Sequence, residues 1–323
     1  MAAETTNKGT REDTRTDERV TVIFISGSGR SGTTILDRVL GLTPQTFSGG
    51  EMRFVWERNL IENRPCSCGV LFRSCEHWNA VMDEAFGGME NVPTEEIRAL
   101  QRKVDRYRCL HWLIQPVRPP SFTRALHDYS HYLARFYRAI QTVTGRPLIV
   151  DSSKDPPQAL ILASSPAFDV RVIHLVRDSR ATAFSWLRRK ESRMASGPML
   201  MQIRPVTTSA RRWWYHNLTS ELLRPKAAYY RMKYEDLVAD PDAVLAGVAS
   251  VLDIPVISNG REVNLPVQHL TTGNPIRFES GPATIKADNE WATKMSAKDF
   301  AVVTGMTAPL LLRYGYRLTR PQQ

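Results

Sequence analysis

The segment Gly27–Thr34, GSGRSGTT, has the outline of a loop that binds phosphate. In the pattern G-x-x-x-x-G-K-[ST], backbone N–H groups surround phosphates and the lysine reaches the terminal ones. Gly27 and Gly32 take the glycine positions, but Thr33 stands where the lysine belongs, and Arg30 is the loop's only cation. The segment therefore predicts a phosphate site without the lysine of γ-phosphoryl transfer. The residues predicted to line it are Ser28, Gly29, Arg30, Ser31, Gly32, Thr33 and Thr34.

Three apolar runs of strand length are each followed by side chains that bind anions. The first run, Val20–Ile25, leads into the loop above. The second, PLIVD, is followed by SSK, whose last residue is Lys154. The third, Val170–Val176, is followed by Arg177, with Ser185 two helical turns farther on. The carboxyl ends of parallel strands meet at one edge of a sheet, where ligands bind. We therefore expect two phosphate sites in one crevice, one at the loop and one at Arg177.

The elements that must position these residues alternate between strand and helix. This alternation predicts an α/β, P-loop-type three-layer fold, a central parallel sheet flanked by helices. We expect a disordered tail over 1–19, because it is polar and lacks an apolar run. A single domain is expected over 20–320, with a largely helical insertion over 60–145. In that insertion, a continuous helix is predicted over 93–114, with a capping pattern at Thr94.

Composition restricts the class of protein. The chain has 323 residues, 42% of them hydrophobic, and a net charge of +10, which suits an anionic ligand. Nucleic acid is disfavoured, because no helix-turn-helix, zinc-finger or RNP signature occurs and the basic residues are dispersed. We find no transmembrane segment and no secretion signal, so the sequence predicts a cytoplasmic protein.

Three cysteines lie close together in RPCSCGVLFRSCEHW. Cys66, Cys68 and Cys75, with His77, offer four soft ligands, a set of residue types that suggests a zinc site. However, C-x-C is tighter than the usual zinc spacing, and a local disulfide is disfavoured in a reducing compartment. The sequence therefore favours packing or turn roles and leaves zinc as an alternative.

The motifs resemble those of the sulfotransferases that use 3′-phosphoadenosine 5′-phosphosulfate (PAPS). GRSGTT is similar to their 5′-phosphosulfate loop, and VIHLVRDSRATAFS to their 3′-phosphate motif. Four more segments resemble segments of the tyrosylprotein branch and of many bacterial members, and they occur in the same order along the chain: SGGEMR, SSKDP, KYEDLVADP and MTAPLLLRYGY. The resemblance covers roughly 20–60 and 145–320 and leaves 60–145 unmatched.

The resemblance implies a reaction and roles for the residues. A hydroxyl acceptor would attack the sulfuryl group, Glu51 would take its proton, and Arg30 and Lys154 would stabilise the leaving phosphate. No metal is required, and the product nucleotide is adenosine 3′,5′-bisphosphate. The other residues predicted to bind the nucleotide are Arg177 and Ser185 at the 3′-phosphate, Tyr234 near adenine, and Asn274 and Arg277 in GNPIRF.

The acceptor itself is not identified by any motif. A small molecule, a carbohydrate or a tyrosine-like hydroxyl fits, and the residues expected on the acceptor side are Arg53, Trp56 and His269. The basic segment 188–212 is equally compatible with a mobile lid and a solvated face. Two alternatives stay open: a P-loop kinase or NTPase with a lysine-less loop, and a non-catalytic nucleotide-binding protein.

Overall fold

A computed structural model of the chain provides the structure. The residues that it describes are 19–188, 191–194, 197–200, 203–257 and 260–321, with the backbone alone described at 191–194 and 197–200. The predicted tail, apart from Arg19, lies outside the described residues.

A five-stranded parallel sheet forms the centre of the protein, in the order β2-β3-β1-β4-β7. The strands are β1 (Val20–Gly27), β2 (Thr46–Ser48), β3 (Leu148–Lys154), β4 (Phe168–Val176) and β7 (Ala228–Lys233). Neighbouring strands in this order are separated by helices in sequence, which parallel pairing requires. The predicted α/β fold with a central parallel sheet is confirmed.

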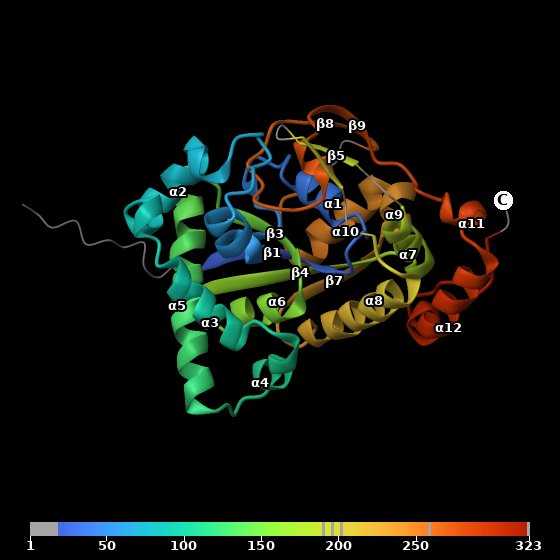
Figure 1. The fold of residues 1–323 in the computed structure, drawn as a ribbon, viewed down its shortest axis with the longest axis horizontal. Helices are drawn as coiled ribbons and strands as arrows, with labels where there is room; N and C mark the ends of the chain where they lie inside the picture. Colours follow the sequence, from blue (N-terminus) through green and yellow to red (C-terminus); the bar gives the residue numbers. More distant parts are fainter. Residues whose placement is uncertain (1–18, 189–190, 195–196, 201–202, 258–259, 322–323) are drawn as a thin grey trace, which may run out of the picture.

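Apolar side chains cover both faces of this sheet. Along β1, Val22 and Phe24 point into one core, and Ile23 and Ile25 point into the other. Such alternation follows from the two-residue period of a strand, and a strand buried on both faces must be apolar throughout. In Figure 1, α1 and α10 lie above the strands, whereas α6 and α8 lie below them.

Helices form the two outer layers and the ends of the molecule. Those of the first half are α1 (Thr33–Leu40), α2 (Glu76–Phe86), α3 (Thr94–Val104), α4 (Leu110–Ile114), α5 (Pro120–Thr144), α6 (Pro156–Ala163) and α7 (Ser179–Leu187). Those of the second half are α8 (Val206–Ser220), α9 (Tyr234–Ala239), α10 (Pro241–Leu252), α11 (Trp291–Lys294) and α12 (Ala297–Arg313). In the part of the chain that the structure describes, no helix has the length and apolar character needed to cross a membrane.

Short elements complete the chain. Two further sheets are antiparallel pairs, one of β5 (Glu191–Met194) with β6 (Gly197–Leu200) and one of β8 (Glu262–Leu265) with β9 (Gly281–Thr284). A π-helix, η3, spans Val55–Ile61. The 3₁₀ helices are η2 (Met52–Phe54), η4 (Phe72–Ser74), η5 (Met89–Asn91), η6 (Tyr107–Cys109), η7 (Glu221–Leu223) and η8 (Pro275–Phe278).

The segment 60–145 is largely helical, but the prediction of one continuous helix over 93–114 is wrong. The expected helix over 93–114 is interrupted between α3 and α4, where the buried Asp105 carboxylate accepts a hydrogen bond of 2.6 Å from Arg53 Nε. The capping box at Thr94 does not form, because its hydroxyl donates to the Val92 carbonyl instead. Long-range side-chain bonds therefore override the local helical pattern at Asp105.

Candidate active site at the carboxyl ends of the strands

The loop between β1 and α1 has the geometry of an anion-binding turn. Gly32 caps α1 with φ 89°, a left-handed conformation that favours glycine. A β-carbon at Gly32 would lie 2.6 Å from the ring of Tyr234, so the position also excludes a side chain sterically. The loop thereby directs the free N–H groups of the α1 N-terminus toward the crevice.

Two adjoining pockets open beside this loop. Pocket A encloses about 170 Å³ and is lined by Arg30, Gly32, Thr33, Thr34, Ile35, Arg177, Ser185, Tyr234, Asn274, Ile276 and Asp288. Pocket B encloses about 230 Å³, and its lining includes Ser28, Gly29, Arg30, Thr34, Glu51, Phe54, Arg58, Lys154, Trp186, Arg204, Ser209, Arg212, His216 and Asn274. Arg30, Thr34 and Asn274 line both pockets, so these residues form the boundary between them.

Arg177 connects the end of β4 to the loop. Its Nη1 donates a hydrogen bond of 3.0 Å to the backbone carbonyl of Arg30, and its guanidinium lies 4.5 Å from the centre of the Tyr234 ring. Asp288 Oδ2 lies 3.3 Å from Nη2 of the same guanidinium. Arg177 is nevertheless buried with its Nε lacking a hydrogen-bond partner among the described residues. Arg177 and Ser185 both line pocket A.

Arg30 lies between the two pockets. Its guanidinium packs over the ring of Trp186, with 4.6 Å between the guanidinium carbon and the ring centre. Burial, and then the nearby charges of Arg204 and Arg188, lower the pKa of Arg30 to about 10. The guanidinium therefore stays protonated at neutral pH, and an added anion would relieve its repulsion with the other arginines.

Glu51 and Lys154 form an ion pair in pocket B. Lys154 Nζ donates to Glu51 Oε1, and Arg58 Nη1 lies 3.4 Å from Glu51 Oε2. The register of β3 against β1 shifts between Phe24 and Ser26, and Lys154 adopts φ 72°. Such an irregularity changes the direction of the side chains that follow it. The carboxylate and the ammonium thus meet although 103 positions separate them in sequence.

Asp37 on α1 fixes the two segments that carry Glu51 and Lys154 by hydrogen bonds to residues close to them in sequence. Its carboxylate accepts hydrogen bonds from the Ser48 hydroxyl, from the Gly50 N–H at 3.1 Å and from the Ser152 hydroxyl at 2.5 Å. Burial raises the pKa of Asp37 to about 7, despite the bonds from Ser152 and Ser48. Asp37 thus connects α1 to the ends of β2 and β3.

Replacing Asp37 by asparagine is expected to reveal this raised pKa. The folded state binds the Asp37 proton more tightly than the unfolded chain does. The contribution of this proton to the stability of the fold is therefore present below the unfolded pKa of Asp37 and disappears as pH rises toward 7. The free energy of unfolding of the wild type, relative to Asp37→Asn, should fall by about 2–3 kcal/mol between pH 5 and pH 7. Urea unfolding of both proteins at the two pH values measures this change. If the difference in unfolding free energy between wild type and Asp37→Asn does not depend on pH, the raised pKa of Asp37 is contradicted.

Comparison with known proteins identifies the family. A family profile described as the sulfotransferase family matches residues 22–258, well over half of the chain. The chain belongs to the sulfotransferase family. The predicted membership of the sulfotransferase family is thereby confirmed, whereas the likeness to the tyrosylprotein branch and the roles of the two motifs stay predictions.

Two solved structures share the sulfotransferase fold. The sulfotransferase domain from the curacin biosynthetic pathway is 19% identical, with a TM-score of 0.52, and the match covers 94% of this chain and 100% of that one. The sulfotransferase domain from the Synechococcus PCC 7002 olefin synthase is 20% identical, with a TM-score of 0.52 and coverage of 96% and 100%. No curated protein matches the chain. At these identities the two domains show the shared fold alone.

The residues predicted for catalysis and nucleotide binding in this sulfotransferase-family chain fall into two groups. Those that line pocket A or B are Ser28, Gly29, Arg30, Gly32, Thr33, Thr34, Glu51, Lys154, Arg177, Ser185, Tyr234 and Asn274. Two others line neither pocket: Ser31 is buried in the loop, and Arg277 donates to the Thr271 carbonyl. The geometry therefore brings most of the predicted residues into one crevice.

The three residues expected on the acceptor side lie elsewhere. Arg53 pairs with Asp105 and with Asp155 at 2.6 and 2.8 Å, Trp56 is buried in the core, and His269 contacts cysteine sulfurs. None of the three lines pocket A or B. Their role on the acceptor side stays a prediction.

Sequence reasoning missed several residues that line pocket B. They are Phe54, Arg58, Asp155, Trp186, Arg204, Ser209, Arg212 and His216. His216 lies on α8, where the Tyr107 hydroxyl contacts its Nδ1 at 2.9 Å, and burial lowers its pKa to about 4. The helical spacing of Arg212 and His216, four positions apart, is the signal that could have found them.

The segment 188–212, for which the sequence left a mobile lid and a solvated face equally open, contains the antiparallel strands β5 and β6 and the start of α8. Residues 189–190, 195–196 and 201–202 lie outside the described residues. Arg188 pairs with Asp288, which in turn contacts Arg177, so the beginning of the segment is connected to pocket A. Both alternatives stay open.

Proposed function

We propose that the protein transfers a sulfuryl group from PAPS to a hydroxyl acceptor. The observation that carries this proposal is the joint lining of pocket A by the phosphate loop and by Arg177 with Ser185. A nucleotide phosphorylated at two separate positions needs two such anion sites. An ordinary nucleoside triphosphate needs only one, together with the lysine that Thr33 replaces.

The residues present fit a doubly phosphorylated nucleotide. Arg177, which lines pocket A, has a buried Nε without a hydrogen-bond partner in the described structure. Leaving such a group unpaired costs about 1–3 kcal/mol, and a bound phosphate would satisfy it. In this proposal, the N–H groups before α1 hold the 5′ side, Arg177 and Ser185 hold the 3′-phosphate, and Tyr234 lies near the base. Asn274, from the loop before η8, lines the wall between the two pockets.

The catalytic groups are Arg30, Lys154 and Glu51. When bound, the donor supplies a sulfuryl group whose transfer leaves negative charge on the 5′-phosphate. Arg30 and Lys154 stabilise that charge from fixed positions, as donors in an oxyanion hole do. Glu51 accepts the proton of the attacking hydroxyl, which requires that its carboxylate exchange the bond with Lys154 for one with the acceptor.

Pocket B supplies the acceptor side in this proposal. The Ser209 hydroxyl there is buried without a hydrogen-bond partner among the described residues, and Phe54 and Trp186 offer ring surfaces. Arg204 and Arg212 add positive charge. We infer an acceptor hydroxyl on a small molecule, a carbohydrate or a tyrosine-like ring, with a nearby anionic group favoured by the two arginines.

Nucleotide binding to Arg177→Ala tests the proposal. The wild type should bind adenosine 3′,5′-bisphosphate about 10- to 100-fold more tightly than AMP, the range expected for charge-assisted hydrogen bonds to one phosphate. Arg177→Ala should lose most of this preference. Titration calorimetry with both nucleotides and with ATP–Mg²⁺ provides the measurement.

The matched control is Arg313→Ala, which removes an exposed arginine that pairs with Glu221 on the surface and lines neither pocket. It should retain the wild-type preference. Equal wild-type affinities for AMP and the bisphosphate would overturn the two-site argument. Tighter binding of ATP–Mg²⁺ would favour the kinase alternative instead.

A further inference from the structure

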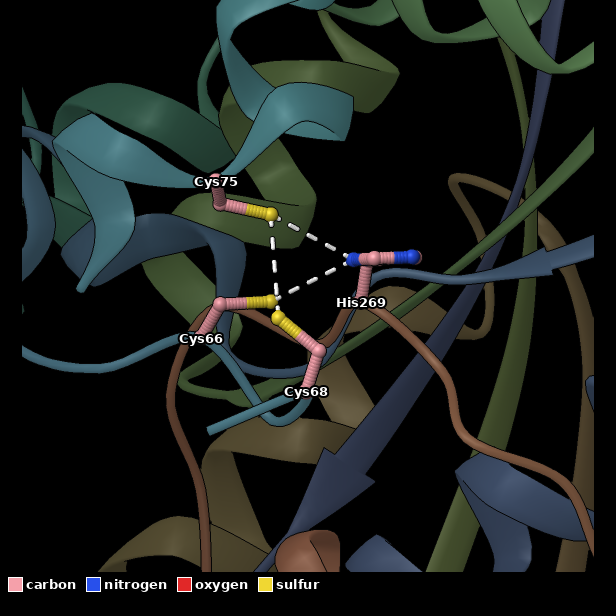
Figure 2. A group of neighbouring side chains, drawn as sticks. All are labelled: Cys66, Cys68, Cys75 and His269. Atoms are coloured by element: carbon pink, nitrogen blue, oxygen red, sulfur yellow. Dashed lines mark hydrogen bonds between the residues drawn. The ribbon is translucent and has the colours of Figure 1, made fainter. Parts of the chain in front are cut away.

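Four potential metal ligands meet outside the pockets. The ligand atoms of Cys66, Cys68, Cys75 and His269 all lie within 4.8 Å of one another. Figure 2 shows the three sulfurs and the imidazole of His269 pointing toward a common centre. Three of these residues belong to the cysteine-rich segment, whereas His269 comes from the segment before η8, 194 positions after Cys75.

The separations match those of a tetrahedral zinc site. With Zn–S near 2.3 Å and Zn–N near 2.0–2.1 Å, a tetrahedron places two sulfurs about 3.8 Å apart and a sulfur and a nitrogen about 3.6 Å apart. Cys68 Sγ and Cys75 Sγ are 3.8 Å apart. His269 Nδ1 lies 3.6 Å from Cys66 Sγ and 3.4 Å from Cys75 Sγ. These three separations agree with the tetrahedron, and the remaining pairs of ligand atoms lie within 4.8 Å of each other.

A disulfide and simple packing both describe this arrangement less well. A disulfide needs two sulfurs about 2.05 Å apart, and all four cysteines of the chain are free thiols. Packing alone gives no reason for three thiols and a ring nitrogen to converge on one point. The candidate ligand His77 is replaced by His269, whose ring stacks on that of His77 with 4.6 Å between centres.

The backbone holds the two ligand segments together. Gly69, at φ 92°, closes a turn in which the Gly69 N–H donates to the Cys66 carbonyl at 2.9 Å. Ser67 N–H donates to the Leu270 carbonyl at 3.1 Å, and Leu270 N–H donates to the Ser67 hydroxyl at 2.7 Å. The Ser67 hydroxyl also donates to the Gln268 carbonyl at 2.5 Å, so hydrogen bonds to Ser67 hold the chain on both sides of His269. Cys66 and Cys75 are buried, whereas Cys68 and His269 are partly exposed, which leaves an approach for an ion.

We propose that Cys66, Cys68, Cys75 and His269 bind one structural Zn²⁺. Four protein ligands of this soft S₃N set leave no open position, which is typical of a structural and not a catalytic zinc site. The ion would connect the cysteine-rich segment to residues 268–272. This connection reaches the proposed active site, because Thr272 accepts a bond of 3.0 Å from Glu51 N–H and Thr271 accepts one from Arg277.

Metal analysis of the full-length protein is the direct test. Protein expressed with added zinc, purified with a non-thiol reductant and dialysed should contain one zinc per chain by plasma mass spectrometry. Replacing zinc by Co²⁺ should produce the visible absorption of tetrahedral cobalt together with sulfur-to-cobalt charge transfer. Any of three results would overturn the proposal: a folded wild-type protein without metal, an octahedral cobalt spectrum, or a Cys68–Cys75 disulfide in the mass spectrum.

Variants separate this site from accidental thiol binding. Cys68→Ser and His269→Ala should lose the zinc and lower the melting temperature. Cys109→Ser is the matched control, because Cys109 is a buried thiol on η6 whose hydrogen bond to the Lys103 carbonyl a serine can keep. It should retain one zinc. Full zinc retention by Cys68→Ser and His269→Ala, or equal loss in Cys109→Ser, would overturn the ligand assignment. Since the readouts are metal content and cobalt absorption, they do not depend on the proposed sulfuryl transfer.

Discussion

Glu51→Gln is expected to lower turnover by about two to three orders of magnitude, the scale of a lost general base. Glutamine keeps the shape of the side chain and removes its capacity to accept the hydroxyl proton. Affinity for adenosine 3′,5′-bisphosphate should change little, because Glu51 lines pocket B and not pocket A. Single-turnover kinetics with PAPS and calorimetry with the bisphosphate measure the two quantities.

A control distinguishes a base from a structural partner. Glu62→Gln removes an exposed carboxylate that pairs with Arg64 on the surface and should leave turnover unchanged. If Glu51→Gln weakens nucleotide binding as much as turnover, Glu51 only positions Lys154 and Arg58. If turnover persists, another base must act, and His216 is the first candidate, since it lines pocket B and burial keeps its pKa near 4, so that the imidazole is neutral.

Arg30→Ala is expected to lower turnover by about 10²- to 10³-fold, as does the loss of one oxyanion-hole donor. The loop itself should persist, because the hydrogen bond from Arg177 is accepted by the backbone carbonyl of Arg30, which alanine retains. Arg30→Lys should recover part of the rate, since it restores the charge without the planar fork of donors. Rapid-quench measurement of sulfuryl transfer provides the rate for each variant.

Arg313→Ala again serves as the control for removing one arginine. Unchanged turnover in Arg30→Ala would contradict a catalytic role. Full recovery in Arg30→Lys would show that charge alone matters at this position. A loss of nucleotide affinity without a change in the transfer rate would assign Arg30 to binding instead.

The parts of the site that could be predicted from sequence are formed by neighbouring residues. The loop around Gly32 and the position of Arg177 follow from a strand, a turn and a helix that are consecutive in the chain. The meeting of Glu51 and Lys154 goes beyond this local pattern, because the two residues lie far apart in sequence. Glu51 follows β2 and Lys154 ends β3, and the sheet places these two strands side by side.

The tertiary structure alone decided which distant side chains join these groups. Arg212 and His216 line pocket B because α8 packs against the sheet beside the loop, a placement that its local sequence does not encode. Likewise, the sequence placed three cysteines within ten residues but offered His77 as their partner. His269 takes that position because hydrogen bonds between Ser67 and Leu270, one of them to the Ser67 hydroxyl, bring two remote segments together. Such contacts depend on the packing of the whole chain, which no local pattern of residue types contains.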